Sequence, residues 1–254
     1  MVILETTFKE LNKAVKKNLT EKQLNEILFN LGLELDSVEK NNIKIEITPD
    51  RPDLLSTQGL ARALRSYLGL KNEKYKIKKS GETIKVINTN KEWPYAVACI
   101  VKGLNLDNEK IKEIIRIQEK LGATFLRHRK KGGLGLYPLE KIKFPVTFTS
   151  LEPDKIKYRP LEYQEVITGK EILEKHPTGK TYKNIIKNWE KYPVFLDADN
   201  SVMSMPPIVN SHNLGKINEK TKNVFIEATG TDLKTINLAF NVLRSWVEIE
   251  DPNI

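Results

Sequence analysis

The order of apolar patterns between residues 20 and 69 constrains the fold of this chain more than any other feature. The stretch "TEKQLNEILFNLG" at 20–32 begins with a capping box, places its apolar residues on one face and stops at glycine, which predicts an amphipathic helix. "NIKIEIT" at 42–48 alternates isoleucine with charged residues and predicts a strand with one buried face. Helical spacing returns in "LLSTQGLARALRSYLG" at 54–69. The first seventy residues therefore predict a small α+β module.

A charged segment separates this module from the rest of the chain. "KNEKYKIKKSG" at 71–81 has almost no apolar periodicity, which indicates a linker or a solvated hairpin. Beyond it, the patterns predict a strand at 95–102, a helix at 108–121, and later a hairpin and a strand that leads into the last helix. We therefore predict an α+β fold with an N-terminal module at 1–75 and a larger mixed α/β domain at 85–250.

The composition excludes several classes of protein. A chain of 254 residues with 39% hydrophobic residues can build a core, but its longest apolar runs, such as "YAVACIV" at 95–101, are far shorter than the roughly 20 residues of a membrane-spanning helix. The single cysteine, Cys99, provides neither a disulfide framework nor a cysteine metal cluster and favours a reducing cytoplasm. The three histidines stand alone, so no metal site is expected.

The chain is basic, with a formal net charge of +9. Lysines near phosphates release counterions, so this charge is compatible with a polyanion such as RNA. The other interpretation is that lysine is spread over solvated faces, and charge alone slightly favours it. The segment "RHRKKGG" at 127–133 has the same two interpretations: a loop that contacts RNA phosphates, or a solvated run of charge.

Catalytic motifs are incomplete or missing in the sequence. "HPTGKTY" at 176–182 contains the Gly-Lys-Thr end of a phosphate-binding loop, but Glu174 stands where the motif requires its first glycine, and we predict a turn there. No GxSxG elbow occurs, and serine, histidine and acidic residues do not follow a spacing known from nucleophilic catalysis. If the chain is an enzyme, we therefore expect it to work by positioning its substrate.

Two stretches of the sequence resemble one family. "EITPDRPDLLSTQGLARALRSYLG" at 46–69 resembles the N-terminal module of the phenylalanyl-tRNA synthetase beta subunit of archaeal and eukaryotic type. "SMPPIVNSHNLGKINEKTKNVFIEATGTDL" at 204–233 is similar to the core of that subunit's editing domain, where a PPI-N-S loop precedes a T-N-FI-(D/E)-TGTD strand. The two motifs occur in the family's order, so the larger domain is expected to be an editing domain.

The resemblance implies a function in translation quality control. A pocket shaped for an apolar side chain rejects an analogue with one more hydroxyl by only about a hundredfold, so a second, hydrolytic site is needed to remove tyrosine from tRNA(Phe). We therefore expect this chain to hydrolyse tyrosyl-tRNA(Phe) and to bind the acceptor end of tRNA(Phe). A second expected partner is the alpha subunit of the synthetase or the remaining portion of the beta subunit. The alternative is a non-catalytic module that binds tRNA or a synthetase and has lost editing.

The family's beta subunit continues into further modules, whereas this sequence stops about where the editing domain would finish. We therefore expect a fragment, a split-gene product or a free-standing editing factor. In the family, ATP and Mg²⁺ belong to parts of the complex outside this sequence. No cofactor and no synthetic active site are expected in this chain alone.

The family's editing pocket, carried over position by position, falls on five residues. Asn210 and Glu227, the latter where the family often has aspartate, are expected to select tyrosine by hydrogen bonds, and Phe195 to form a wall. Ser204 and Thr229 are expected to place the ester or the attacking water, without a serine nucleophile because no base adjoins it. Each of four residues also has a structural alternative. Asn210 can cap a turn, Ser204 can be an ordinary polar residue at a strand end, Glu227 can face outward from a strand, and Phe195 can belong to the core.

The charged stretch "TPDRPD" at 48–53 invites a catalytic interpretation because Asp50, Arg51 and Asp53 lie so close together. Its prolines instead favour an extended turn, and Asp53 or Ser56 can cap the helix that follows. We therefore predict a structural role for these residues.

Overall fold

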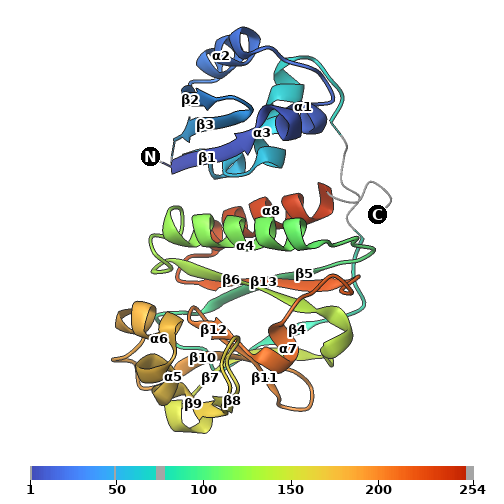
Figure 1. Ribbon diagram of the computed structural model, residues 1–254. Helices are drawn as coiled ribbons and strands as arrows, with labels where there is room; N and C mark the ends of the chain where they lie inside the picture. The colour runs from blue at the N-terminus through green and yellow to red at the C-terminus, as the bar shows by residue number, and fades with distance from the viewer. Residues whose placement is uncertain (1, 49, 73–77, 250–254) are drawn as a thin grey trace.

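The computed structural model describes residues 2–48, 50–72 and 78–249, with side chains as far as residue 245. Helices and several sheets make up the fold, which confirms the predicted α+β class. Figure 1 shows the parts stacked on one another: an N-terminal sheet with its helices, a layer formed by two long helices, and two further sheets.

The N-terminal part is a small antiparallel sheet covered by helices. The strands are β1 (Val2–Thr7), β2 (Glu34–Glu39) and β3 (Asn42–Ile47), and they lie in the spatial order β1-β3-β2. The helices are α1 (Phe8–Val15), α2 (Glu21–Asn30) and α3 (Thr57–Tyr67). Thr20 and Gln23 form the capping box that begins α2, and Ile43, Ile45 and Ile47 of β3 are fully buried. The helices and the strand predicted between residues 20 and 69 are confirmed.

The charged stretch before α3 has a structural role, as predicted. Arg51 donates to both carboxylate oxygens of Asp53, at 3.0 and 2.8 Å, on the exposed surface. Ser56 caps α3, because its hydroxyl accepts a hydrogen bond from the N–H of Gly59.

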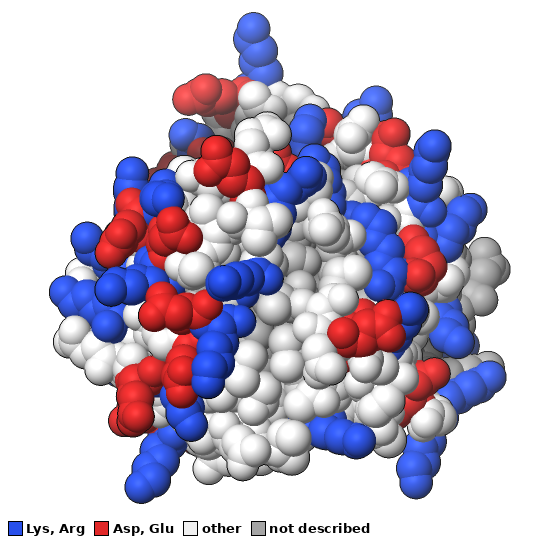
Figure 2. Space-filling view, turned by 90° about the horizontal axis from the view of Figure 1, so that it is seen from below, with Lys and Arg blue, Asp and Glu red and all other residues white. Residues whose placement is uncertain are grey.

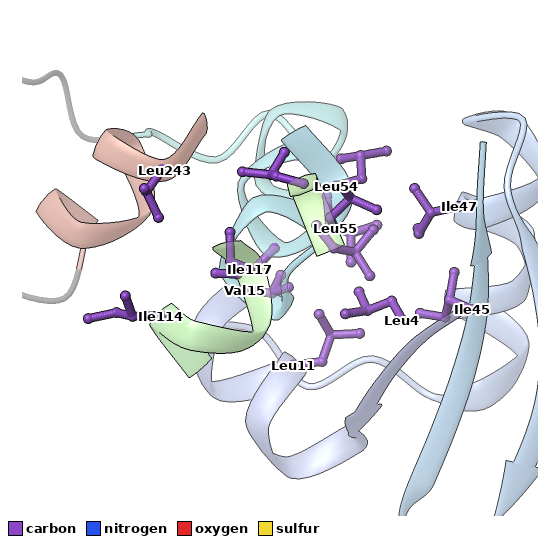
Figure 3. Packing of buried hydrophobic residues seen from close by; sticks show 14 of the residues in the cluster. Leu4, Leu11, Val15, Ile45, Ile47, Leu54, Leu55, Ile114, Ile117 and Leu243 are labelled. Carbon is purple, nitrogen blue, oxygen red and sulfur yellow. The ribbon is translucent and has the colours of Figure 1, made fainter. Parts of the chain in front are cut away.

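A layer of two helices connects the N-terminal part to the next sheet. These are α4 (Asn108–Ala123), capped by Asp107, and α8 (Leu233–Ile249). One hydrophobic cluster includes residues of β1, β3, α1 and α3 together with residues of α4 and α8. Figure 3 shows Val15 and Leu55 of the N-terminal part beside Ile117 of α4, while Ile114 and Leu243 extend the cluster to α8.

The predicted linker at 71–81 lies partly outside the described residues. The division into a module at 1–75 and a domain at 85–250 therefore remains a prediction. The two parts nevertheless share a hydrophobic core, so burial of apolar surface between them contributes to the stability of both.

The next sheet is antiparallel and has β13 in its centre. Its order is β5 (Tyr95–Val101), β13 (Val224–Gly230), β6 (Gly132–Pro138). Every residue of β13 is buried, because the two helices cover one face of the sheet and the second sheet covers the other. Ile226 and Ala228 belong to the cluster on the helix side, whereas Phe225 belongs to a second cluster between the two sheets.

The second sheet has the order β12-β11-β10-β7-β4. Its strands are β4 (Ile84–Val86), β7 (Val146–Leu151), β10 (Tyr192–Leu196), β11 (Val202–Met205) and β12 (Val209–Asn210). The predicted hairpin is confirmed as the antiparallel pair β10 and β11. In its turn, the Asp197 carboxylate accepts hydrogen bonds from the N–H groups of Asp199 and Ser201.

Short elements complete the fold. They are β8 (Lys157–Tyr158), β9 (Ile167–Thr168), α5 (Gly169–Lys175), α6 (Pro177–Tyr182), α7 (His212–Gly215) and 3-10 turns at Pro52–Leu54, Leu139–Lys141, Pro153–Lys155 and Lys183–Ile185. The turn predicted at 176–182 is wrong, since His176 caps α6 and Pro177 occupies its first position. Among the described residues, no helix is long and apolar enough to cross a membrane, and no group of three histidine, cysteine, aspartate or glutamate side chains is placed to bind a metal ion.

The shared core predicts that a buried residue of α4 stabilises the protein much more than its exposed neighbour. Ile117 is 2% exposed and Ile115 is 48% exposed. We expect Ile117→Ala to lower the free energy of unfolding by about 2–5 kcal/mol, because it removes buried methyl groups and leaves a cavity. Ile115→Ala on the same helix should lower it by less than about 1 kcal/mol. Urea denaturation measures both values, and equal losses would contradict the packing described.

Candidate active site

A buried polar cluster lies between the two sheets and brings together three of the residues predicted from the sequence. The hydroxyl of Tyr137 on β6 lies 2.8 Å from Oγ of Ser204, 3.3 Å from Oδ1 of Asn210 and 3.2 Å from Oε1 of Glu227. The amide of Asn210 also donates to the carbonyl of Leu136 at 3.4 Å. Side chains from β6, β11, β12 and β13 therefore meet at one phenol oxygen.

Strand periodicity explains why β13 contributes polar residues to this cluster. Phe225, Glu227 and Thr229 alternate along β13 and face the second sheet, while the residues between them face the helices. The register pairs Glu227 with Gly135 and Thr229 with Gly133 on β6. Ala98 and Ala96 of β5 are the partners on the other side. Small residues thus flank both polar side chains on this face.

The glycines of β6 are required by the close packing of the cluster. A Cβ atom at Gly135 would overlap Oε1 of Glu227 and would lie 2.7 Å from the hydroxyl of Tyr137. At Gly133 a Cβ atom would lie 3.2 Å from Cα of Pro207, which belongs to the loop between β11 and β12. The missing side chains let the polar groups and this loop approach the sheet.

The loop between β11 and β12 is fixed by Arg129. One guanidinium nitrogen of Arg129 donates to the carbonyls of Pro207 and Ile208, each at 3.1 Å. The other donates to Glu119 at 3.1 Å, and the guanidinium carbon lies 4.3 Å from the centre of the Tyr182 ring. The sequence motif "PPIVN" is therefore a wall of the cluster, stabilised from the basic segment at 127–133.

The basic segment has an unusual backbone. Arg127, His128 and Arg129 have φ angles of 51°, 53° and 61°, in the left-handed region that side chains other than glycine rarely adopt. Such a conformation costs roughly 1–2 kcal/mol per residue. The strain is offset in part by the contacts of Arg129, while Arg127 and His128 remain exposed.

Two buried side-chain atoms of β13 have no hydrogen-bond partner among the described residues. They are Oε2 of Glu227 and Oγ1 of Thr229, on the same face of β13. Glu227 is 2% exposed and Thr229 is fully buried. An unpaired buried polar atom costs about 1–3 kcal/mol and is rare in native proteins. These two atoms therefore need a water molecule or a ligand as their hydrogen-bond partner.

Burial determines the charge of the cluster. It raises the pKa of Glu227 to about 8, and the hydrogen bond from Tyr137 lowers that pKa by a smaller amount. Burial, followed by the nearby Glu227, raises the pKa of Tyr137 well above its usual value. At neutral pH these shifts favour the neutral acid of Glu227 and the protonated phenol of Tyr137.

The structure decides between several interpretations left open by the sequence. Glu227 is not an outward-facing strand residue, since both faces of β13 are covered. The side chain of Asn210 contacts the hydroxyl of Tyr137 and the carbonyl of Leu136 on β6, rather than capping the turn after "PPIV". Phe195 is a core aromatic that packs against Phe148 with ring centres 4.9 Å apart, so its part in a pocket remains a prediction.

Comparison with known proteins agrees with this architecture. The family model described as Phe-tRNA synthetase beta subunit B1 domain matches residues 1–70. A solved structure, an N-terminal fragment of the phenylalanyl-tRNA synthetase beta subunit from Pyrococcus horikoshii, matches 98% of this chain and 74% of its own length with a TM-score of 0.89 and 34% sequence identity. The chain belongs to the phenylalanyl-tRNA synthetase beta-subunit family.

Curated members of this family extend the comparison. The phenylalanine–tRNA ligase beta subunit of Thermococcus kodakarensis is 37% identical over 243 residues, which cover 92% of this chain and 42% of the relative. That of Methanosphaera stadtmanae is 34% identical over 248 residues, which cover 96% of this chain and 44% of the relative. The chain therefore spans less than half the length of these beta subunits.

Sequence reasoning did not predict the roles of two residues, Tyr137 in the cluster and Arg129 in its wall. Tyr137 lies in "GGLGLYP", where Gly133, Gly135 and Tyr137 occupy alternate positions of one strand face, and this spacing was the available signal. Arg129 belongs to the basic segment, which was considered only as a phosphate contact or as solvated charge.

The raised pKa of Glu227 predicts a pH dependence of stability. The folded state retains the Glu227 proton up to about pH 8, whereas the unfolded state releases it near pH 4.5. The folded state therefore binds more protons between these values, and its stability falls as pH rises, by up to about 1.4 kcal/mol per pH unit. Glu227→Gln removes this contribution. Denaturation at pH 5, 6 and 7 should show a wild-type stability that falls relative to the variant, and parallel profiles would exclude a buried neutral acid.

Proposed function

We propose that this chain hydrolyses the ester of tRNA(Phe) that has been mischarged with tyrosine, as a quality-control part of a phenylalanine–tRNA ligase beta subunit. The observation that carries this proposal is a buried cluster that already binds one phenol hydroxyl, that of Tyr137. On the same face of β13, Oε2 of Glu227 and Oγ1 of Thr229 have no partner among the described residues. A site built to hydrogen-bond a hydroxyl rejects an analogue that lacks it by several orders of magnitude. Such a site distinguishes tyrosine from phenylalanine.

The predicted residues take distinct roles in this hydrolysis. Asn210 and Glu227 recognise the tyrosine, while Ser204 and the backbone near Thr229 place a water molecule against the ester carbonyl. The water adds to the carbonyl carbon, the bond to the ribose oxygen breaks, and a proton from the water passes to that oxygen, so that tyrosine and free tRNA(Phe) are released. Ser204 contacts a phenol rather than a base, in keeping with positioning rather than nucleophilic attack.

The surroundings of the cluster indicate how the substrate arrives. Asn210 is half-buried, whereas the other members of the cluster are buried, so the aminoacyl end is expected to enter past Asn210. Arg127, His128 and Lys130 are exposed in the basic turn and are suited to contact RNA phosphates. Figure 2 shows the molecule from below, with basic and acidic residues both present around an uncharged centre. We therefore propose that the exposed residues of the basic turn contact the RNA phosphates, and we do not base these contacts on the positive net charge of the whole chain.

The second candidate function is a non-catalytic module that binds tRNA or a synthetase. It is favoured by the closure of the cluster, since Ser204, Glu227 and Thr229 are 1%, 2% and 0% exposed. A catalytic site of this kind must open to admit an amino acid. The two candidates differ in whether ester hydrolysis occurs at all.

A deacylation assay separates the two candidate functions. The purified chain is incubated with tyrosyl-tRNA(Phe) and, separately, with phenylalanyl-tRNA(Phe), and loss of the ester is followed against buffer. We expect faster loss of the tyrosine ester, because only tyrosine supplies a hydroxyl to the cluster. Loss at the buffer rate for both esters, together with retained tRNA binding, would establish the non-catalytic module instead.

Asn210 should contribute to selectivity. Asn210→Ala removes a side chain that contacts the phenol cluster, so we expect the ratio of tyrosine to phenylalanine ester hydrolysis to fall about tenfold, the effect of one hydrogen bond of about 1.4 kcal/mol. Asn213→Ala is the matched control, since Asn213 is exposed in the adjacent α7. Rate constants for both esters are compared, and an unchanged ratio in Asn210→Ala would assign recognition to other residues.

A further inference from the structure

The segment that follows β8 runs antiparallel to the segment that carries Asn210. The N–H of Leu161 donates to the carbonyl of Asn210 at 2.8 Å, and the N–H of His212 donates to the carbonyl of Arg159, also at 2.8 Å. These two bonds hold the segment after β8 in a fixed place. Arg159 therefore lies beside the proposed entrance to the site.

Side chains alternate in direction along these two segments. Pro160 and Ser211, which form a bridge between the segments, are buried. Arg159 and His212, the next residues along, are half-buried, and so is Asn210 on the other side of Ser211. Arg159 and His212 therefore share the more accessible face, from which the aminoacyl end is expected to reach Asn210.

Two nitrogen atoms on this face have no hydrogen-bond partner among the described residues. They are Nε of Arg159 and Nδ1 of His212. Both atoms are buried although their side chains are half-buried. Charged groups that leave water are normally paired, and an unpaired polar atom is unfavourable. The described residues do not supply an acceptor for this nitrogen of Arg159, so its guanidinium is suited to an acceptor from outside the chain.

The charges around His212 are mostly positive. Burial, followed by the charges of Arg159 and Lys216, lowers the pKa of His212, and Lys141 lowers it further. Glu162 has the opposite effect, but its carboxylate already accepts a hydrogen bond from Nζ of Lys216 at 3.0 Å. Among the groups that shift this pKa, one carboxylate therefore faces three positive side chains, which leaves an excess of positive charge.

A phosphodiester is the anion that this position favours. In an aminoacyl-tRNA the amino acid is esterified to the last ribose, and the phosphodiester between the last two nucleotides is the anionic group nearest to that ester. An ester that enters past Asn210 brings this phosphodiester toward the face that carries Arg159. A guanidinium matches two phosphate oxygens at once, and lysines add positive charge around them.

We propose that Arg159, with Lys141 and Lys216 beside it, binds the phosphodiester that joins the last two nucleotides of the tRNA. The identity of this phosphodiester rests on the proposed function, because the position of the ester determines which end of the RNA lies here. The ion pair between Lys216 and Glu162 is exposed, so exchanging it for a phosphate contact costs little. The basic turn at 127–130 contacts other phosphates.

The test uses deacylated tRNA(Phe), so that binding is measured without hydrolysis. One RNA is unmodified, and the other carries a neutral methylphosphonate in place of the last phosphodiester. We expect the wild type to bind the modified RNA about tenfold more weakly, because a charge-assisted contact is lost. Arg159→Ala should bind both RNAs with similar, lower affinity, because its partner for that charge is missing.

Three further variants make the test specific. Arg159→Lys keeps the positive charge and should retain part of the sensitivity to methylphosphonate. Arg116→Ala is the matched control, since it removes an exposed arginine of α4 and should retain the full sensitivity. Lys141→Ala removes an exposed lysine, should reduce the sensitivity, and tests the site even if Arg159→Ala does not fold. The slope of log affinity against log salt should fall by about one in Arg159→Ala.

His212 provides a second measurement that does not depend on activity. Positive charges lower the pKa of its imidazole, so a bound phosphodiester should raise it. The imidazole is titrated by NMR with the protein alone, with unmodified tRNA(Phe) and with the methylphosphonate RNA. The chain has only three histidines, so His212→Gln identifies the signal. We expect the larger rise with the unmodified RNA.

The outcomes distinguish failure of this inference from failure of the proposed function. The phosphodiester site is overturned if methylphosphonate has no effect in the wild type, if it has the same effect in Arg159→Ala, or if the pKa of His212 does not change. Binding of inorganic phosphate that depends on Arg159, without a methylphosphonate effect, overturns it in favour of a site for small anions. Absence of tyrosine ester hydrolysis overturns the proposed function alone, when the methylphosphonate effect is retained.

Discussion

The burial of β13 on both faces is the constraint on which the rest of the structure depends. One face must be apolar to pack against α4 and α8, and Ile226 and Ala228 satisfy that requirement. The other face carries Glu227 and Thr229 into a space that excludes water. A polar group in such a place needs a partner, so the cluster around Tyr137, the glycines of β6 and the loop fixed by Arg129 all follow from the position of one strand.

The same burial gives the site its chemistry. In water, a glutamate is charged at neutral pH and accepts hydrogen bonds at both oxygens. Between two sheets, burial favours the neutral acid of Glu227, whose two oxygens differ: one is bonded to a phenol, and the other has no partner among the described residues. In such an environment a polar group without a partner is most unfavourable.

Local patterns predicted the elements well, and the family resemblance located most of the cluster. The capping box at Thr20 and the alternation in β3 depend on near neighbours, so they are visible in sequence. Tyr137 and Glu227 are 90 residues apart, and their contact depends on the pairing of β6 with β13, which no local pattern reveals. The protonation of Glu227 likewise requires knowing that both faces of its strand are covered. The turn predicted at 176–182 came from an incomplete phosphate-loop motif, and that argument did not consider the cap at His176 that begins α6.

The left-handed turn at Arg127, His128 and Arg129 links two distant parts of the chain. Its backbone is unfavourable on its own, and the contacts that stabilise it are made by Arg129 with carbonyls 78 and 79 residues away. In turn, the guanidinium of Arg129 supplies the hydrogen-bond donor for the carbonyl groups of Pro207 and Ile208 in the loop between β11 and β12. Because each segment is stabilised by the other, we expect the exposed basic surface and the wall of the cluster to order and melt together.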